Sequence, residues 1–234
     1  MKSVAACFLI AAGMITFAAE APAQESWQSA LNRMPLKEDV TELNRTNCVP
    51  LLLGAFQSNA VVKGVVFMPG ATDELYFFKR VHAGIPGVHP SLLNEVEALT
   101  NQTQIRATFQ PPLLLLHTSE DALDPIVTIR SAATAARLHE RHVPDRLIFN
   151  DADWDHVWAG LDHEVSVGLR PWSGSPDSWH FYRHSFAVCD VSEWELMEAL
   201  AAANKTGFTV HWRTVTFKTD LRYGPVKPPE GLSR

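Results

Sequence analysis

An acid and a histidine in the middle of the chain have the residue types that proton transfer requires. Asp121 follows an apolar run at residues 113–116, and His156 lies further along. A carboxylate that orients an imidazole lets the imidazole accept a proton from a serine or cysteine nucleophile. Before Asp121, the nucleophiles that could serve are Ser58 and Cys48, and neither has flanking glycines. Asp121 and His156 are therefore the candidate catalytic pair, and the sequence offers no clearly activated nucleophile to go with them.

Residues 112–158 resemble the C-terminal part of the α/β-hydrolase family. The resemblance rests on an apolar strand that ends in Ser119-Glu120-Asp121, a helix, a strand at residues 146–149, and Asp155-His156. It implies that Asp121 orients His156 and that His156 activates a serine in a Gly-x-Ser-x-Gly turn. That pentapeptide is absent from the sequence. We therefore expect no working serine hydrolase, and a divergent or degenerate hydrolase-like enzyme is the alternative function.

Four aspartates have a spacing that resembles a calcium-binding loop. Asp151, Asp153 and Asp155 stand at positions 1, 3 and 5 of a twelve-residue segment, and Asp162 stands at position 12. Alternating oxygen ligands of this kind wrap around one hard cation. His156 occupies position 6, where such loops need glycine, and position 12 lacks the usual glutamate. We interpret the segment as a solvated acidic loop, with a calcium site as the alternative.

Four tryptophans are concentrated in and after the same segment, at Trp154, Trp158, Trp172 and Trp179. Tryptophans in a polar loop can form a binding surface for a protein or a carbohydrate. They can equally anchor a long loop to the body of the protein, because each ring buries a large apolar area. The sequence leaves both interpretations open, and these four residues are the candidate binding residues.

The N-terminus has the three parts of a cleavable secretory signal. Lys2 precedes an apolar run at residues 4–19, and Ala21-Pro22-Ala23 supplies a small-x-small cleavage site. Residues 1–23 are therefore predicted to be removed, and the protein is expected to be secreted or periplasmic. The run is too short for a membrane anchor, and no later segment is long and apolar enough to span a bilayer.

Charge and cysteine content limit the remaining classes of partner and cofactor. The net charge is −6 and no basic block occurs, so binding to nucleic acid is not expected. No cofactor is predicted. Two cysteines follow the signal, Cys48 and Cys189. In an oxidising compartment they could form a disulfide, and the alternative is two free thiols.

Periodicity and turn residues predict an α+β fold, a mixed sheet with helices packed on one face. The strongest local unit is a helix over residues 193–205, with Ser192 and Glu195 as a capping box and Gly207 as its stop. A half-buried strand with Phe208, Val210 and Trp212 follows, then a turn or bulge near residues 213–214. Other predicted elements are a hairpin over residues 61–78, a buried strand at 113–116, a helix at 126–141 and a strand at 146–149. An α/β-hydrolase-like fold is the alternative.

The predicted domain organisation is a body at residues 24–150, a long surface loop at 151–177, a helix–strand unit at 178–223 and a loose tail at 224–234. Asn-x-Thr follows a helical segment at three places, which suggests repeated helix–strand units. The blander interpretation is that asparagine ends three helices. In a eukaryotic source the same sites, at Asn44, Asn101 and Asn204, would be glycosylation acceptors.

Residues 186–219 resemble the short domain at the N-termini of secretins and TonB-dependent receptors. The matching segments are Phe186-Ala187-Val188, Asp190-Val191-Ser192, Ala199-Leu200 and Gly207-Phe208-Thr209-Val210, with Leu196. The resemblance implies a small envelope domain that docks to partners and has no catalytic residues. The sequence therefore predicts a non-enzymatic module that binds a protein or a component of the cell envelope.

Overall fold

A computed structural model describes residues 25–36, 42–44, 46–75, 81–82, 90–118, 123–171 and 183–219. The predicted signal at residues 1–23 and the predicted tail at 224–234 lie outside these residues. The helices are α1 (Trp27–Asn32), α2 (Cys48–Ala55), α3 (Pro69–Glu74), α4 (Leu92–Gln102), α5 (Ala132–Glu140), α6 (Trp154–Leu161) and α7 (Glu193–Asn204). Together with open mixed sheets, they confirm the predicted α+β class.

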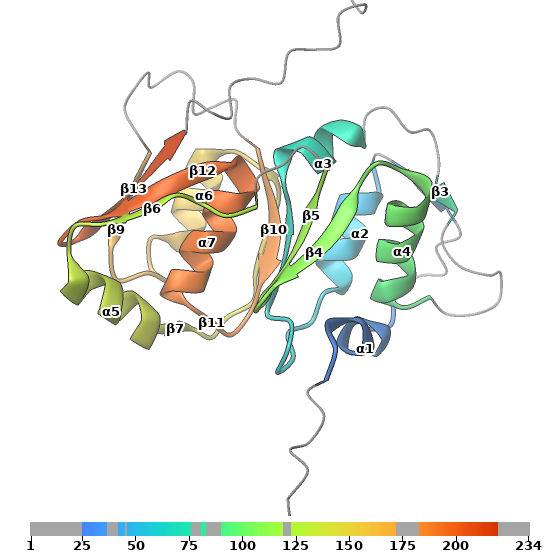
Figure 1. The fold of residues 1–234 in the computed structure, drawn as a ribbon, viewed down its shortest axis with the longest axis horizontal. Coiled ribbons are helices and arrows are strands. Elements are labelled where there is room, and N and C mark those ends of the chain that lie inside the picture. The colour runs from blue at the N-terminus through green and yellow to red at the C-terminus, as the bar shows by residue number, and fades with distance from the viewer. Residues whose placement is uncertain are drawn as a thin grey trace, which may run out of the picture.

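The centre of the molecule is a five-stranded mixed sheet (Figure 1). Its strands, in spatial order, are β4 (Arg106–Gln110), β5 (Leu113–His117), β2 (Gly64–Phe67), β10 (His184–Val188) and β8 (Leu147–Ala152). β2 and β5 are parallel, and the other neighbours are antiparallel. The predicted buried strand at residues 113–116 is confirmed as β5, whose five residues are all buried.

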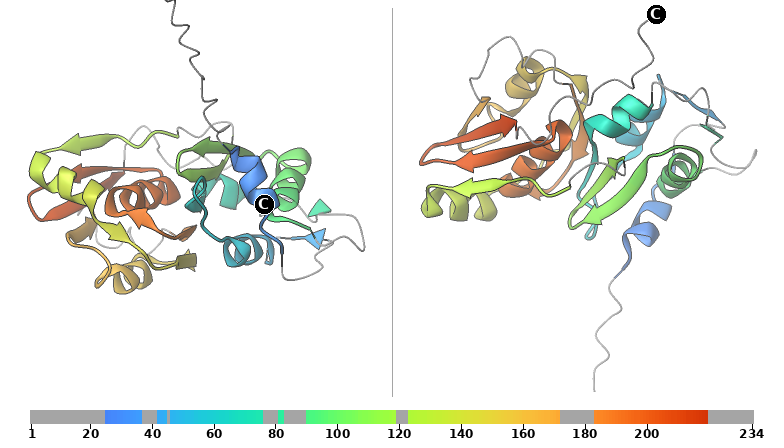
Figure 2. Two further views of the ribbon diagram at one scale, coloured as in Figure 1. Left: turned by 90° about the horizontal axis from the view of Figure 1, so that it is seen from below. Right: turned by 45° about the horizontal axis from the view of Figure 1, so that its top comes forward.

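Both faces of the central sheet are covered, so the prediction of helices on one face was wrong. Val65 and Phe67 of β2 pack into an N-terminal core with α1, α2 and α4, whereas Val66 packs into a C-terminal core with α5, α6 and α7. Figures 1 and 2 show the two groups of helices on opposite sides of β10 and β2. The reason is that the mostly apolar residues of β2, β5 and β10 are buried at successive positions, and strands of this kind need cover on both faces.

α7 lies between the central sheet and a second, four-stranded sheet. That sheet has the order β6 (Val127–Ile129), β12 (Thr206–Val210), β13 (Thr214–Thr219) and β9 (Gly168–Pro171). The capping box of Ser192 and Glu195 is confirmed, and Leu196, Met197 and Leu200 are fully buried as predicted. Because α7 has neighbours on several sides, most of its residues are buried.

Lys205 ends α7, and the prediction that Gly207 stops the helix was wrong. Lys205 adopts the left-handed conformation, with φ of 51°. Gly207 lies within β12, where a Cβ atom would come within 2.3 Å of the Ile126 carbonyl oxygen. Glycine is needed there because Ile126, the residue before β6, lies close against the backbone of β12. The turn predicted near residues 213–214 joins β12 to β13.

Two other predicted segments have a different structure. The prediction of a hairpin over residues 61–78 was wrong, because Pro69 begins α3 after β2. Proline is favourable in the first turn of a helix. The long loop at 151–177 is wrong up to residue 171, where the structure has α6 and β9. The Asp153 side chain caps α6, and Trp154, Val157 and Leu161 recur at helical spacing.

The remaining elements differ from the predictions mainly in their bounds. The helix predicted over residues 126–141 begins only at Ala132, because β6 occupies the preceding residues. The two short ladders pair β1 (Glu42–Leu43) with β3 (Val81–His82) and β7 (His142–Val143) with β11 (Val191–Ser192). In the part of the chain that the structure describes, no helix combines the length and apolarity needed to cross a membrane.

Candidate functional site

His156 has a carboxylate partner among the described residues, Asp153. Asp121 lies outside the described residues. Asp153 Oδ1 accepts hydrogen bonds from the backbone N–H of His156 at 3.0 Å and contacts its Nδ1 at 2.6 Å. These hydrogen bonds lower the pKa of Asp153. In the described part of the chain the Asp153–His156 pair caps α6, and no serine or cysteine there forms a hydrogen bond with His156.

The four aspartates of the calcium hypothesis lie at different positions around β8 and α6. Asp151 lies near the end of β8 with φ of 49°, Asp153 caps α6, Asp155 lies in its first turn and Asp162 follows its last residue. Within the described ranges, no group of three or more His, Cys, Asp or Glu side chains is placed to hold a metal ion. The helical path of α6 separates ligands that a calcium loop would bring to one centre.

Two of the four candidate tryptophans lie in the described part of the chain, and neither forms an exposed surface. Trp154 is 6% exposed, and its ring lies 5.6 Å from that of His184 and 5.7 Å from that of Phe217. Trp158 is half-buried against the same C-terminal core. Trp172 and Trp179 lie outside the described residues. For Trp154 the interpretation as a structural anchor is therefore the correct one.

Both cysteines are free thiols, so the structure has no disulfide between Cys48 and Cys189. Cys48 is fully buried at the start of α2. Burial, with a smaller effect of the nearby Glu95 carboxylate, raises the pKa of the Cys48 thiol. Cys189 is half-buried at the end of β10, where its thiol lies 3.7 Å from the carbonyl oxygen of Pro144.

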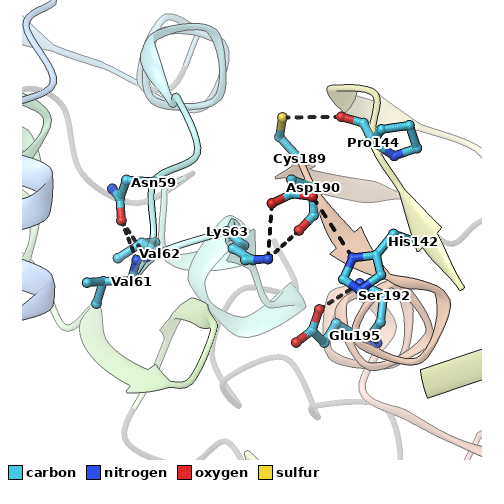
Figure 3. Close-up of polar contacts among 10 residues, drawn as sticks. All are labelled: Asn59, Val61, Val62, Lys63, His142, Pro144, Cys189, Asp190, Ser192 and Glu195. Carbon is cyan, nitrogen blue, oxygen red and sulfur yellow. Dashed lines mark hydrogen bonds and ion pairs between the residues drawn. The ribbon is translucent and has the colours of Figure 1, made fainter. Parts of the chain in front are cut away.

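Next to Cys189, a polar cluster joins the start of β2 to the turn after β10 (Figure 3). Lys63 Nζ donates to the carbonyl oxygen of Asp190 at 2.7 Å and to its carboxylate at 3.1 Å. His142 Nδ1 lies 3.9 Å from the other carboxylate oxygen. Asp190 has φ of 54°, and the lysine contacts hold this left-handed turn in place. The groups are satisfied by one another, and we interpret the cluster as structural.

A second polar group lies inside the C-terminal core. His184 Nδ1 lies 3.1 Å from the Ala152 carbonyl oxygen, and the side-chain amide of Asn204 contacts Nε2. A neutral imidazole with its proton on Nδ1 satisfies both contacts. Burial lowers the pKa of His184 to about 4.

The three Asn-x-Thr sites differ in exposure. Because Asn204 is buried, the folded protein cannot present it to a glycosyltransferase, whereas Asn101 is exposed and Asn44 is half-buried.

The exposed tryptophan of the described residues is Trp212, which the sequence pattern had assigned to a half-buried strand. Trp212 lies in the turn between β12 and β13 and is 73% exposed. Its carbonyl oxygen accepts a hydrogen bond from Thr134 at 2.6 Å, which ties the turn to the start of α5. The guanidinium of Arg213 lies 5.0 Å from the centroid of the Trp212 ring. The turn therefore presents an aromatic ring and a cation to solvent.

Edge strand β6 brings a second apolar side chain and a second cation to the same place. Ile129, 53% exposed, pairs with Val210, two residues before Trp212, and the backbone N–H of Arg130 donates to the Val210 carbonyl at 2.9 Å. We call Ile129, Arg130, Trp212 and Arg213 the end patch. Figure 2 shows the β12–β13 turn at the opposite end of the molecule from α1 and α4.

The end patch has the composition of a protein-binding surface. Large exposed hydrophobic side chains in the described residues are Ile126, Ile129, Ile148 and Trp212, and the first of these also belongs to the segment that enters β6. Tryptophan and arginine are the residue types enriched at the energetic centres of interfaces. β6 is an outermost strand of its sheet, and such a strand presents backbone N–H and C=O groups on its outer side.

Comparisons with models of protein families, with curated proteins and with solved structures found no match to this chain.

Proposed function

We propose that the protein is an exported, non-enzymatic module and that it binds another protein through the end patch. The observation that carries this proposal is the exposure of Trp212 and Ile129 at the same end of the neighbouring strands β12 and β6, with Arg213 over the Trp212 ring and Arg130 following Ile129. A folded chain that has two well-filled cores leaves such side chains in water only at some cost, and exposed apolar groups rimmed by polar ones typically mark interaction sites.

The chemistry of the patch favours a protein partner with acidic side chains. The Trp212 ring offers a rigid apolar surface, which loses little conformational entropy on binding. Two guanidinium groups can each form paired hydrogen bonds with a carboxylate. The exposed edge of β6 can add main-chain hydrogen bonds to an extended segment of the partner. Each of these contributions requires close contact with another chain.

Site-specific photocrosslinking in the source cell tests the docking surface. A benzophenone side chain placed at position 212 should give a crosslinked adduct with one defined protein, and the same group at position 97, on the far side of the molecule, should not. Glu97 is exposed on α4 and is a matched control position. Ile129→Asp should abolish the adduct without unfolding the protein, because Ile129 is mostly exposed. Equal adducts from positions 97 and 212, unaffected by Ile129→Asp, would contradict the proposal.

Export is tested separately by N-terminal sequencing of the protein recovered from outside the cytoplasm. The sequence should begin at or near Gln24, directly after Ala21-Pro22-Ala23. Protein recovered there with Met1 still present would rule out cleavage of the predicted signal.

A further inference from the structure

A cavity of about 350 Å³ lies between the β4–β5 turn, α7 and residues 123–125. Its apolar wall comes from Phe109, Leu113, Leu115, Leu123 and Ala202. A volume of this size is within the range of small-molecule sites in proteins. The cavity shares no residue with the end patch.

One wall of the cavity carries a carboxylate that its neighbours hold in position. Glu198 of α7 is half-buried, and its Oε1 accepts a hydrogen bond from Trp194 Nε1 at 2.8 Å. The Trp194 ring is itself fixed, because it stacks on His139 at 4.3 Å and packs edge-on against Phe208 at 5.4 Å. The orientation of the Glu198 carboxylate is therefore set before any ligand arrives.

A second carboxylate lines the cavity from residues 123–125. Asp124 Oδ1 accepts a hydrogen bond from Gln110 Nε2 at 3.1 Å. No lysine or arginine is found among the described residues that line the cavity. Burial, the largest influence, raises the pKa of Glu198, as does the nearby Glu195. A half-buried carboxylate beside apolar side chains gains stabilisation from a cation that enters the cavity.

We propose that this cavity is a binding site for a primary ammonium group carried on an apolar aliphatic chain. The ammonium supplies three N–H donors to Glu198 and Asp124. The methylene chain lies against Leu113, Leu115 and Ala202, where it leaves water. Two sources offer this chemistry, a free alkylamine and the lysine side chain of another protein.

Heteronuclear NMR titration with n-pentylammonium tests the site directly. Amide signals of α7 and of the β4–β5 turn should shift, whereas those of α4 should not. n-Pentanol and n-pentanoate have the same chain without the cation, and we expect each to bind at least about tenfold more weakly, because a charge-assisted hydrogen bond is lost. Equal binding of n-pentanol and n-pentylammonium would overturn the proposal.

Two variants connect the binding to the two carboxylates. Glu198→Gln retains an acceptor for Trp194 and removes the charge, and Asp124→Asn does the same on the other wall. Glu198→Gln should weaken n-pentylammonium binding by about tenfold or more, and Asp124→Asn, which changes an exposed carboxylate, by about two- to fivefold, whereas the control Glu97→Gln should not change it. Unchanged affinity in both cavity variants would show that the carboxylates do not recognise the cation.

A short acetylated peptide with one lysine, titrated in parallel, separates the two sources of the ligand. Tighter binding of n-pentylammonium indicates a free amine, and tighter binding of the peptide indicates a lysine side chain of a partner. Absence of binding by both probes at millimolar concentration would overturn the assignment of the cavity.

Discussion

The two cores that share the central sheet each bury a glutamate, but only one of these carboxylates has polar partners among the described residues. In the C-terminal core, Glu193 is fully buried, and its carboxylate contacts Arg141 at 2.9 Å and accepts hydrogen bonds from Ser166 at 2.6 and 3.0 Å. In the N-terminal core, Glu95 is also fully buried, but neither of its carboxylate oxygens has a hydrogen-bond partner among the described residues.

The same residue type is therefore buried with polar partners in one core and without hydrogen-bond partners among the described residues in the other. A buried carboxylate is tolerated when a cation and hydrogen-bond donors replace the water that it loses. Without them the carboxyl retains its proton, and burial raises the pKa of Glu95 to about 7. The pH dependence of stability should therefore separate the two cores.

The largest expected loss of stability comes from Leu→Ala substitutions that create a cavity in either core. These variants test whether the two cores unfold together. Leu200→Ala in α7 and Leu99→Ala in α4 each remove a fully buried side chain and should each cost about 2–5 kcal/mol. Because β2, β5 and β10 contribute to both cores, we expect one cooperative transition in urea in each variant. Two separate transitions would show that the cores are independent folding units.

The next effect is a loss of stability at neutral pH that originates in Glu95. The folded-state pKa, about 7, lies above the ordinary value of 4.5, so only the unfolded chain ionises between these values. Stability should fall by up to about 3 kcal/mol as pH rises from 4.5 to 7. Glu95→Gln should remove this slope in urea titrations, and the exposed Glu97→Gln should leave it unchanged. A slope that survives Glu95→Gln would assign it to other groups.

Ionisation of His184 should change folding stability in the opposite direction to Glu95, so that stability falls as pH is lowered, and by a smaller amount over the accessible pH range. Its folded-state pKa, about 4, lies below the ordinary value of 6.5, so stability is present above pH 6.5 and is lost as pH falls toward 4. Between pH 6.5 and 5 the loss should be about 2 kcal/mol. His184→Gln cannot ionise and should flatten this acid side of the curve. An unaltered acid side in that variant would contradict the assignment to His184.

The smallest effect concerns His156, one of the exposed histidines of the C-terminal half. The His156 side chain is 79% exposed and its ion pair with Asp153 lies at the surface, so His156→Ala should change stability by less than about 1 kcal/mol. A panel of short-chain aryl esters should show no turnover that depends on His156 or Asp121, because the sequence has no Gly-x-Ser-x-Gly turn and no serine of the described residues forms a hydrogen bond with His156. Robust hydrolysis that His156→Ala and Asp121→Ala both abolish would instead support the hydrolase-like alternative.

Local sequence was sufficient to predict elements whose signals lie within a few neighbouring residues. The start of α7 follows from Ser192 and Glu195, which satisfy free backbone N–H groups at a helix start. The strand at residues 113–117 follows from its continuous apolar run. The turn after β12 follows from the change of alternation near Arg213. In each case hydrogen bonds and side-chain spacing within one segment decide the conformation.

Only the tertiary structure decided which polar and aromatic side chains are buried. Trp154 and Trp212 have the same chemistry, but Trp154 lies on the inner face of α6, whereas the β12–β13 turn carries Trp212 beyond the edge of the core. Asn204 is buried because it contacts His184, twenty residues away in the chain. Burial depends on which distant segments meet, and for that reason the sequence predicted α7 but not the end patch, the cavity beside Glu198 or the buried carboxyl of Glu95.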